Sequence, residues 1–315
     1  MRQISFQGIE NIIPRLKLFL GLSRTPHGLL DVATPAMVAM LQLGHFPQLS
    51  TIIIGLIAAF SGYTAVYAMN DLIDVSVDRE RLALKNVPRS FSDIDTVMVE
   101  HPVAKGLLSF RKGIFWVIFW TAVAMVTITV LNPVCLLIFL VSACCEALYC
   151  KLLKITHWKI VSSAIVKASG GLAGVYAVNP QPDPAFVVFS FLWLACWEIG
   201  GQNIANDIVD MEEDLKVGAK TIVTVRSLSK SVYVLLVAAS MATFAGVTIF
   251  LLAGPGVGWI YPVGATVLGY LLILGPAKLV YESPSPKTAA VLFNRTSFMP
   301  IAFLALTVIS IWIRI

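Results

Sequence analysis

Two short acidic stretches carry the residues of this chain that are best suited to chemistry. Each begins with an Asn, at Asn70 and at Asn206, and the next residue is the first of three Asp. The three Asp are spaced i, i+3 and i+7, which on a helix places their carboxylates on one face. The first acid triplet is Asp71, Asp74 and Asp78, and the second acid triplet is Asp207, Asp210 and Asp214.

Carboxylates at this spacing repel one another, so they indicate a cation that neutralises them. Ligands that offer only oxygen point to Mg²⁺ rather than to zinc. Two facing triplets could hold two or three Mg²⁺ ions, which commonly bridge carboxylates to phosphate oxygens, and a diphosphate is therefore the expected ligand. Basic residues nearby that could meet the remaining phosphate charge are Lys105, Lys151 or Lys154, Lys216 and Lys220.

A single Asp triplet at helical spacing is usually a solvated helix face. The recurrence of the same Asn-Asp start and spacing argues against that interpretation here. His101 and His157 are expected to be loop or interface residues rather than metal ligands, because neither has a second His at ligand spacing. The five Cys show no metal spacing and are expected to be small core residues.

The elements that must position the triplets are membrane helices. The 315 residues are 57% hydrophobic and 13% charged, with a mean hydropathy of +0.83, which excludes an ordinary soluble domain. Apolar runs long enough to cross a bilayer recur, and only helices satisfy the backbone there in a chain of this pattern. We predict an all-α bundle of nine transmembrane helices around a central cavity. The expected spans are 28–43, 49–69, 113–131, 134–149, 160–178, 185–204, 231–253, 258–281 and 289–313.

The second and sixth of these spans end at the two triplets. Of the 23 Lys and Arg, all but Lys167 and Arg314 fall on one side if the N-terminus and the loops after even-numbered spans share it. The positive-inside rule makes that side cytoplasmic. Both triplets then face one cytoplasmic site, capped by the polar stretches 71–112 and 205–230. We expect a lipid bilayer around the protein and no nucleic-acid partner.

A diphosphate site on a bundle of apolar helices suits a substrate with a hydrocarbon tail, such as a polyprenyl diphosphate. Metal ions and Lys would stabilise the leaving diphosphate, and aromatic faces would stabilise the allylic cation. Glu198 and Lys167 lie inside predicted spans, where ionisable groups are costly and often functional. A buried pair between these two residues is the structural alternative.

On the basis of the two Asp triplets, the sequence resembles the UbiA-type intramembrane prenyltransferases over nearly its whole length. That family has nine transmembrane helices and an Asp-rich motif after the second and the sixth. The residues Gly218-Ala219-Lys220-Thr221 are similar to its Gly-x-x-Thr, and Tyr149 with Lys154 resembles its Tyr and Lys/Arg region after helix four. The sequence departs from the family at His101-Pro102, where Arg-Pro is common, and 81–100 is extended.

The resemblance implies that residues 1–315 form a single prenyltransferase domain. It implies that the six triplet Asp bind Mg²⁺ and the diphosphate, with Asn70 and Asn206 supporting them. Contacts to the substrate would come from Lys105, Lys154, Lys220, Tyr149 and Arg24.

The acceptor is less constrained than the donor. We expect an aromatic quinone precursor such as 4-hydroxybenzoate, hence a role in ubiquinone or menaquinone synthesis in a bacterial or archaeal inner membrane. A non-quinone lipid or a tetrapyrrole is the alternative acceptor. A divalent-cation transporter would place carboxylates at mid-span rather than at helix exits. A CDP-alcohol phosphotransferase would need an Asp-Gly-x-x-Ala-Arg run, which is absent.

Overall fold

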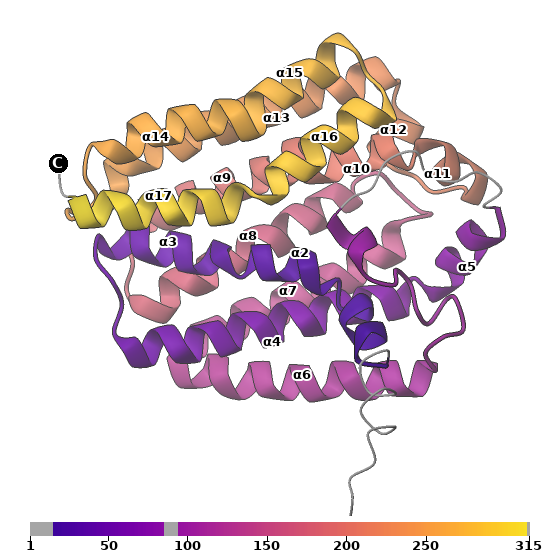
Figure 1. Ribbon diagram of the computed structural model, residues 1–315, viewed down its shortest axis with the longest axis horizontal. Coiled ribbons are helices and arrows are strands. Elements are labelled where there is room, and N and C mark those ends of the chain that lie inside the picture. Colours follow the sequence, from indigo (N-terminus) through magenta and orange to yellow (C-terminus); the bar gives the residue numbers. More distant parts are fainter. Residues whose placement is uncertain (1–14, 85–93, 314–315) are drawn as a thin grey trace, which may run out of the picture.

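The structure is a computed structural model that describes residues 15–84 and 94–313. Within these ranges the chain forms helices joined by turns, as the sequence predicts (Figure 1). Expectations that concern residues 85–93, part of the predicted cap 71–112, fall outside the described residues.

Eight helices or helix runs are long and apolar enough to cross a bilayer. They are α4 (Leu49–Ile73), α6 (Phe110–Leu131), α7 (Pro133–Leu152), α8 (Lys159–Val178), α9 with its continuation α10 (Pro184–Val209), α13 with η3 (Leu228–Leu252), α14 with α15 (Ile260–Glu282), and α16 with α17 (Pro286–Ile313). The predicted first span is divided instead into α2 (Thr25–Asp31) and α3 (Ala33–Leu43), which are each too short to count. The prediction of nine long transmembrane helices is therefore not confirmed for the described residues.

The main core lies where α3, α8, α9 and α13 to α17 meet. Its largest fully buried side chains include Trp193, Trp197, Tyr261 and Phe303. Small residues allow close backbone approach: a Cβ on Gly174 of α8 would lie 2.2 Å from the carbonyl oxygen of Pro35 in α3. Many large apolar side chains instead point outward, as expected of a bundle whose solvent is lipid.

Both acidic stretches contain a break in the helix, which the spacing rule did not predict. Helix α4 ends at Ile73 and α5 (Val75–Leu84) follows, so Asp74 stands between them with φ −85° and ψ 1°. In the same way α10 (Ile204–Val209) and α11 (Met211–Val217) flank Asp210, with φ −94° and ψ 6°. The middle Asp of each triplet thus occupies the sparsely populated bridge region rather than a helix interior.

The two breaks lie at the same end of the bundle, which we call the carboxylate end. Figure 1 shows α5, α11 and α12 (Ile222–Val225) together at this end, while the α3–α4 connection and the C-terminus lie at the other, the far end. Helices α5 and α11 pack against each other. The predicted cap 205–230 is largely helical, because α10, α11, α12 and the start of α13 (Leu228–Thr248) occupy it.

Candidate active site

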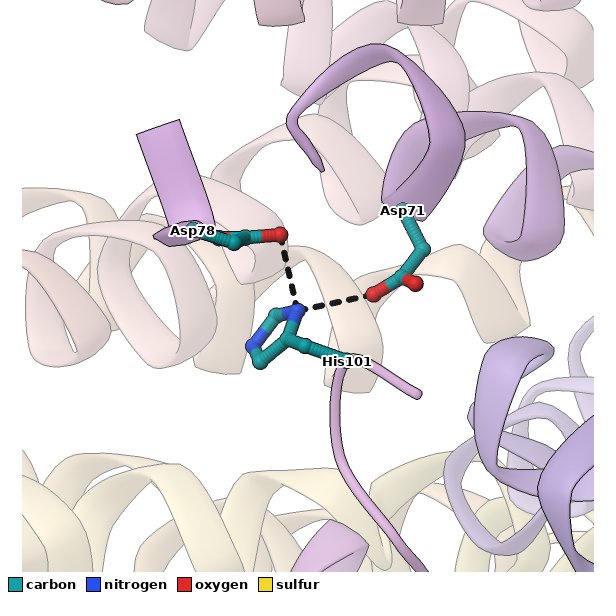
Figure 2. Close-up of side chains that lie close together, drawn as sticks. All are labelled: Asp71, Asp78 and His101. Carbon is teal, nitrogen blue, oxygen red and sulfur yellow. Dashed lines mark hydrogen bonds and ion pairs between the residues drawn. The ribbon is translucent and has the colours of Figure 1, made fainter. Parts of the chain in front are cut away.

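A side chain from the loop before α6 lies between two carboxylates of the first acid triplet. The Nδ1 atom of His101 lies 2.7 Å from an Asp71 carboxylate oxygen and 2.9 Å from an Asp78 oxygen, as Figure 2 shows. Asp71 and Asp78 are both buried, with 2% and 3% of their surface exposed. His101 reaches them from a left-handed backbone conformation, φ 48°, which is uncommon for a residue other than Gly.

His101 lies in a loop, as expected, but it contacts the first triplet, which the sequence did not predict. Burial acts to lower the pKa of His101, but its hydrogen bonds to Asp71 and Asp78 outweigh that and raise the pKa to about 9. The ring is then an imidazolium at neutral pH, and it neutralises part of the charge of the first triplet. It stands where the sequence pattern of the resembled family commonly has an arginine.

The second triplet is held by two basic residues that the sequence analysis did not single out. Arg81 of α5 donates from Nη2 to an Asp214 oxygen at 2.5 Å. Lys159, at the start of α8, lies 3.6 Å from Asp207 and is itself buried. Because Arg81 follows the first triplet and Asp214 ends the second, their ion pair joins the two acidic stretches directly.

Arg81 also interacts electrostatically with Asp210 and Asp78. Burial acts to lower the pKa of Arg81, and the Asp214 and Asp210 carboxylates raise it overall. Among the carboxylates, burial and the neighbouring Asp78 charge raise the pKa of Asp74 to about 6. Burial likewise raises the pKa of Asp214 to about 6, although Arg81 acts in the opposite direction. The two acidic stretches therefore form one connected charged site.

The expected supporting residues take different positions. The Asn70 side chain donates to Glu146 at 2.5 Å, within the protein, whereas the exposed Asn206 donates to Asp210 at 3.3 Å. Tyr149 accepts a hydrogen bond from Lys159 at 2.9 Å and so lies beside the second triplet.

Most of the basic residues that were expected to contact the substrate lie on the protein surface. Lys154 pairs with Glu80 at 2.6 Å on the surface, and Lys105 and Lys220 are exposed. Arg24, between the helical residues 15–22 and α2, has φ 43° and interacts electrostatically with Asp74. Of this group, Arg24 is the one that the structure brings to the first triplet.

The predicted Glu198–Lys167 pair does not form as a salt bridge. Lys167 instead contacts Asp31 of α2, with Nζ 2.8 Å from one carboxylate oxygen and 3.0 Å from the other, and Tyr67 also donates to Asp31. Glu198 accepts a hydrogen bond from Ser163. Asp31 is followed directly by the break between α2 and α3. It was missed even though His27 precedes it by four residues on the same helix and lies 3.8 Å from it.

An apolar cavity of about 390 Å³ lies between α3, α4, α7, α8 and α17. It extends from Phe46 at the far end to Tyr63 and Val66 in the middle of α4. Val66 precedes Asp71 by five residues, which is about 7.5 Å along a helix axis. The cavity therefore approaches the first triplet from within the bundle.

The donor set suits a hard divalent cation. Asp71 and Asp78 each offer a carboxylate oxygen, and these oxygens lie within 4.8 Å of each other and of a His101 ring nitrogen. One Asp71 oxygen is buried without a hydrogen-bond partner among the described residues, so it is free to accept a cation. Carboxylate oxygens are the ligands that Mg²⁺ prefers, whereas the His101 imidazolium contributes charge rather than a lone pair.

Comparison with known proteins identifies the family. The family model of the UbiA prenyltransferases matches residues 32–307. The chain belongs to the UbiA prenyltransferase family. It is accordingly a prenyltransferase, and its apolar helices make it a multi-pass integral membrane protein.

A digeranylgeranylglyceryl phosphate synthase from Thermococcus gammatolerans is 26% identical to this UbiA-family protein over 289 residues, which are 87% of this chain and 91% of the relative. Among solved structures, a UbiA homolog from Aeropyrum pernix K1 has a TM-score of 0.69 at 18% identity, covering 90% of this chain and 97% of that one. A UbiA homolog from Archaeoglobus fulgidus bound to DMAPP and Mg²⁺ has a TM-score of 0.64 at 17% identity, covering 94% and 99%. These structures share the fold of this protein.

Proposed function

We propose that this protein transfers a prenyl group from a prenyl diphosphate to a membrane-associated acceptor, in a reaction that requires Mg²⁺. The observation that carries the proposal is the convergence of the two triplets, joined by the Arg81–Asp214 ion pair, above an apolar cavity. This arrangement offers a charged end for a diphosphate and an apolar space for a hydrocarbon chain. In this proposal residues 1–315 are one domain, and 71–112 and 205–230 close its site.

The six triplet Asp are the proposed Mg²⁺ ligands. Mg²⁺ bound there would neutralise the diphosphate as the allylic C–O bond breaks. The Mg²⁺ and DMAPP of the A. fulgidus homolog support both expectations. Arg24, Arg81 and His101 would supply further positive charge, while Asn70, Asn206 and Tyr149 would hold the Asp and Lys side chains in place.

The prenyl tail is proposed to lie in the apolar cavity. The residues around it are almost all apolar, including Met40, Leu56 and Phe139. Burial of a prenyl chain there is favourable at about 25 cal/mol for each Å² removed from water. Tyr63 and Tyr67, whose rings stack 6.4 Å apart between the cavity and the carboxylates, are suited to stabilise an allylic cation.

Two acceptors are proposed. The first is an aromatic acid of the 4-hydroxybenzoate kind, as the sequence led us to expect, which would place the enzyme in ubiquinone or menaquinone synthesis. The second is a glyceryl phosphate lipid, and the 26% identical synthase favours it. We also propose that the carboxylate end faces the cytoplasm of a bacterial or archaeal cell, because most basic residues lie on that side.

Transfer can be measured on membrane vesicles that contain the protein, supplied with geranylgeranyl diphosphate and either 4-hydroxybenzoate or geranylgeranylglyceryl phosphate. We expect a prenylated product by mass spectrometry with Mg²⁺ and none with EDTA. Inverted vesicles should be active and right-side-out vesicles inactive, because a diphosphate does not cross the bilayer. A product that forms equally well in EDTA would remove the metal assignment, and activity in right-side-out vesicles alone would reverse the orientation.

A further inference from the structure

The sixth span contains a buried acid that the diphosphate site does not use. Glu198 is 6% exposed and begins the π-helix η2 (Glu198–Asn203) between α9 (Pro184–Trp197) and α10. It precedes Asp207 by nine residues, so it lies about 13 Å deeper along the span. Single π-helical turns are rare, and they occur frequently at functional sites.

A chain of hydrogen bonds leads from Glu198 toward the second triplet. Ser163 of α8 donates to one oxygen of Glu198, and Ser163 in turn accepts a hydrogen bond from the Asn203 side-chain amide at 3.1 Å. The same Asn203 amide reaches the Tyr149 hydroxyl at 3.4 Å. Tyr149 is the residue that Lys159 contacts beside Asp207, so the chain ends at the second triplet.

The directions of these bonds leave two hydrogen-bond acceptors unused. The second oxygen of Glu198, Oε2, and the side-chain oxygen of Asn203, Oδ1, are buried and have no partner among the residues that the structure describes. Asn203 is 6% exposed, as Glu198 is. Buried polar atoms are normally paired, and these two acceptors need a donor that the described residues do not supply.

Charged groups face Glu198 from two other helices. Lys167 on α8 and Glu146 on α7 both interact with it electrostatically, and Glu146 is bound by Asn70 beside the first triplet. Helices α13 and α16, which also pack on η2, present neutral groups there, such as Ala239 to Gly200 and Thr296 to Gln202. Glu198 therefore lies deeper in the bundle than the second triplet, connected to it by hydrogen bonds and facing charged groups on α7 and α8.

We propose that Glu198 binds the hydroxyl group of an alcohol acceptor and takes its proton. This inference rests on the proposed function and specifies the acceptor. The acceptor oxygen forms a bond to C1 of the prenyl group, and the bond from C1 to the diphosphate breaks with its electron pair leaving on the diphosphate. The hydroxyl proton passes to Oε2 of Glu198, while Asn203 donates to Ser163 and so orients the Ser163 hydroxyl toward the other oxygen of Glu198.

A base at this place suits an alcohol better than an aromatic carbon. An alcohol is neutral at physiological pH and must lose its proton as the new bond forms. An aromatic carbon loses its proton only after the bond has formed, and from the carbon itself. Glu198 has an unused carboxylate oxygen. If the alcohol binds beside it, this oxygen can take the hydroxyl proton as the new bond forms.

The decisive variant is Glu198→Gln, which keeps the shape of the side chain but cannot take a proton. With geranylgeranyl diphosphate and geranylgeranylglyceryl phosphate we expect kcat for ether formation to fall by about 100-fold or more, the usual range for a lost general base. The KM for the diphosphate and the slow Mg²⁺-dependent release of diphosphate without acceptor should change less than about threefold.

Two further variants control this test. Glu282→Gln removes an exposed acid at the end of α15 (Gly275–Glu282), and we expect wild-type rates from it. Glu198→Asp keeps the charge but withdraws it by one methylene, and we expect about a tenfold lower kcat from it. If Glu198→Gln does not fold in detergent, Glu198→Asp tests the same point.

Several results would overturn the proposal. They are wild-type ether formation by Glu198→Gln, equal loss of diphosphate release and transfer in that variant, and a wild-type product that is prenylated only on the ring of 4-hydroxybenzoate. A wild-type enzyme that transfers to neither acceptor also overturns it. In that last case, persistent Mg²⁺-dependent diphosphate release would still support the donor half of the proposed function, so the two failures are distinguishable.

Discussion

At the scale of single residues, the charges of this site are balanced by groups from distant parts of the chain. His101 sits between Asp71 and Asp78, and Arg81 binds Asp214. The repeated Asp spacing singled out two groups of carboxylates that the Arg81–Asp214 ion pair joins in the structure. It could not predict His101, because a loop residue with positive φ is positioned by tertiary contacts and not by periodicity.

The partner of the buried Lys167 also could not be predicted from sequence periodicity. A pair between Lys167 and Glu198 was one of two alternatives, because both lie inside predicted spans. The partner of Lys167 is Asp31, from a helix pair at the start of the chain. Which of two acids a buried Lys contacts depends on helix rotation and packing, which one sequence does not encode in any local pattern.

The middle Asp of each triplet should be essential for transfer. Asp74→Ala or Asp210→Ala removes a proposed Mg²⁺ ligand from a half-buried position at a helix break, so we expect at least about a 100-fold loss of transfer rate. The folded yield from membranes should be unchanged. Glu212→Ala, an exposed acid beside the second triplet, is the matched control and should be close to wild type. Near-normal turnover by either Asp variant would refute the metal assignment.

At the scale of elements, apolar periodicity and length predicted eight of the spans well. The break of the first span into α2 and α3 was missed, although Pro35 lies three residues after Val32 and a Pro inside a helical pattern often ends or kinks the helix. The breaks at Asp74 and Asp210 were missed as well. Asp is a poor helix interior residue but not a certain helix terminator, so the i, i+3, i+7 spacing favoured a continuous helix.

The cavity under α4 should limit the length of the prenyl chain. A Cβ added at Gly55 would meet no atom within 4 Å, so a larger side chain there would project into the cavity rather than clash. We expect Gly55→Leu to shift the preferred donor to chains shorter by about one isoprene unit with little loss of stability. Competition between geranyl, farnesyl and geranylgeranyl diphosphates measures this preference.

The control for Gly55→Leu is Ile53→Ala on the same helix, where the side chain is 50% exposed on the outside of the bundle. That variant should keep the wild-type donor preference. If Gly55→Leu keeps it as well, the prenyl chain lies elsewhere.

At the scale of the whole molecule, the Arg81–Asp214 pair connects the acidic stretch of α4 and α5 with that of α10 and α11. Arg81→Ala would leave the buried Asp214 carboxylate unpaired, at a cost of about 2 kcal/mol. We expect the melting temperature in detergent to fall by about 4 °C and the KM for the diphosphate to rise. Arg79→Ala, which removes an exposed charge from the same helix, should change neither. An unchanged melting temperature in Arg81→Ala would show that the two stretches are held together by other contacts.

At the far end of the bundle, the loop after α3 and the loop after η3 contact each other through backbone atoms. The Gly254 N–H donates to the Leu41 carbonyl at 2.8 Å, and a Cβ on Gly256 would lie 1.9 Å from the Gly44 carbonyl oxygen. Two loops from opposite halves of the chain thus lie in contact with no side chain between them. Such a junction cannot slide apart by a change of rotamer, because its contacts are made by backbone atoms. A side chain larger than hydrogen at Gly254 or Gly256 would consequently force these two loops apart.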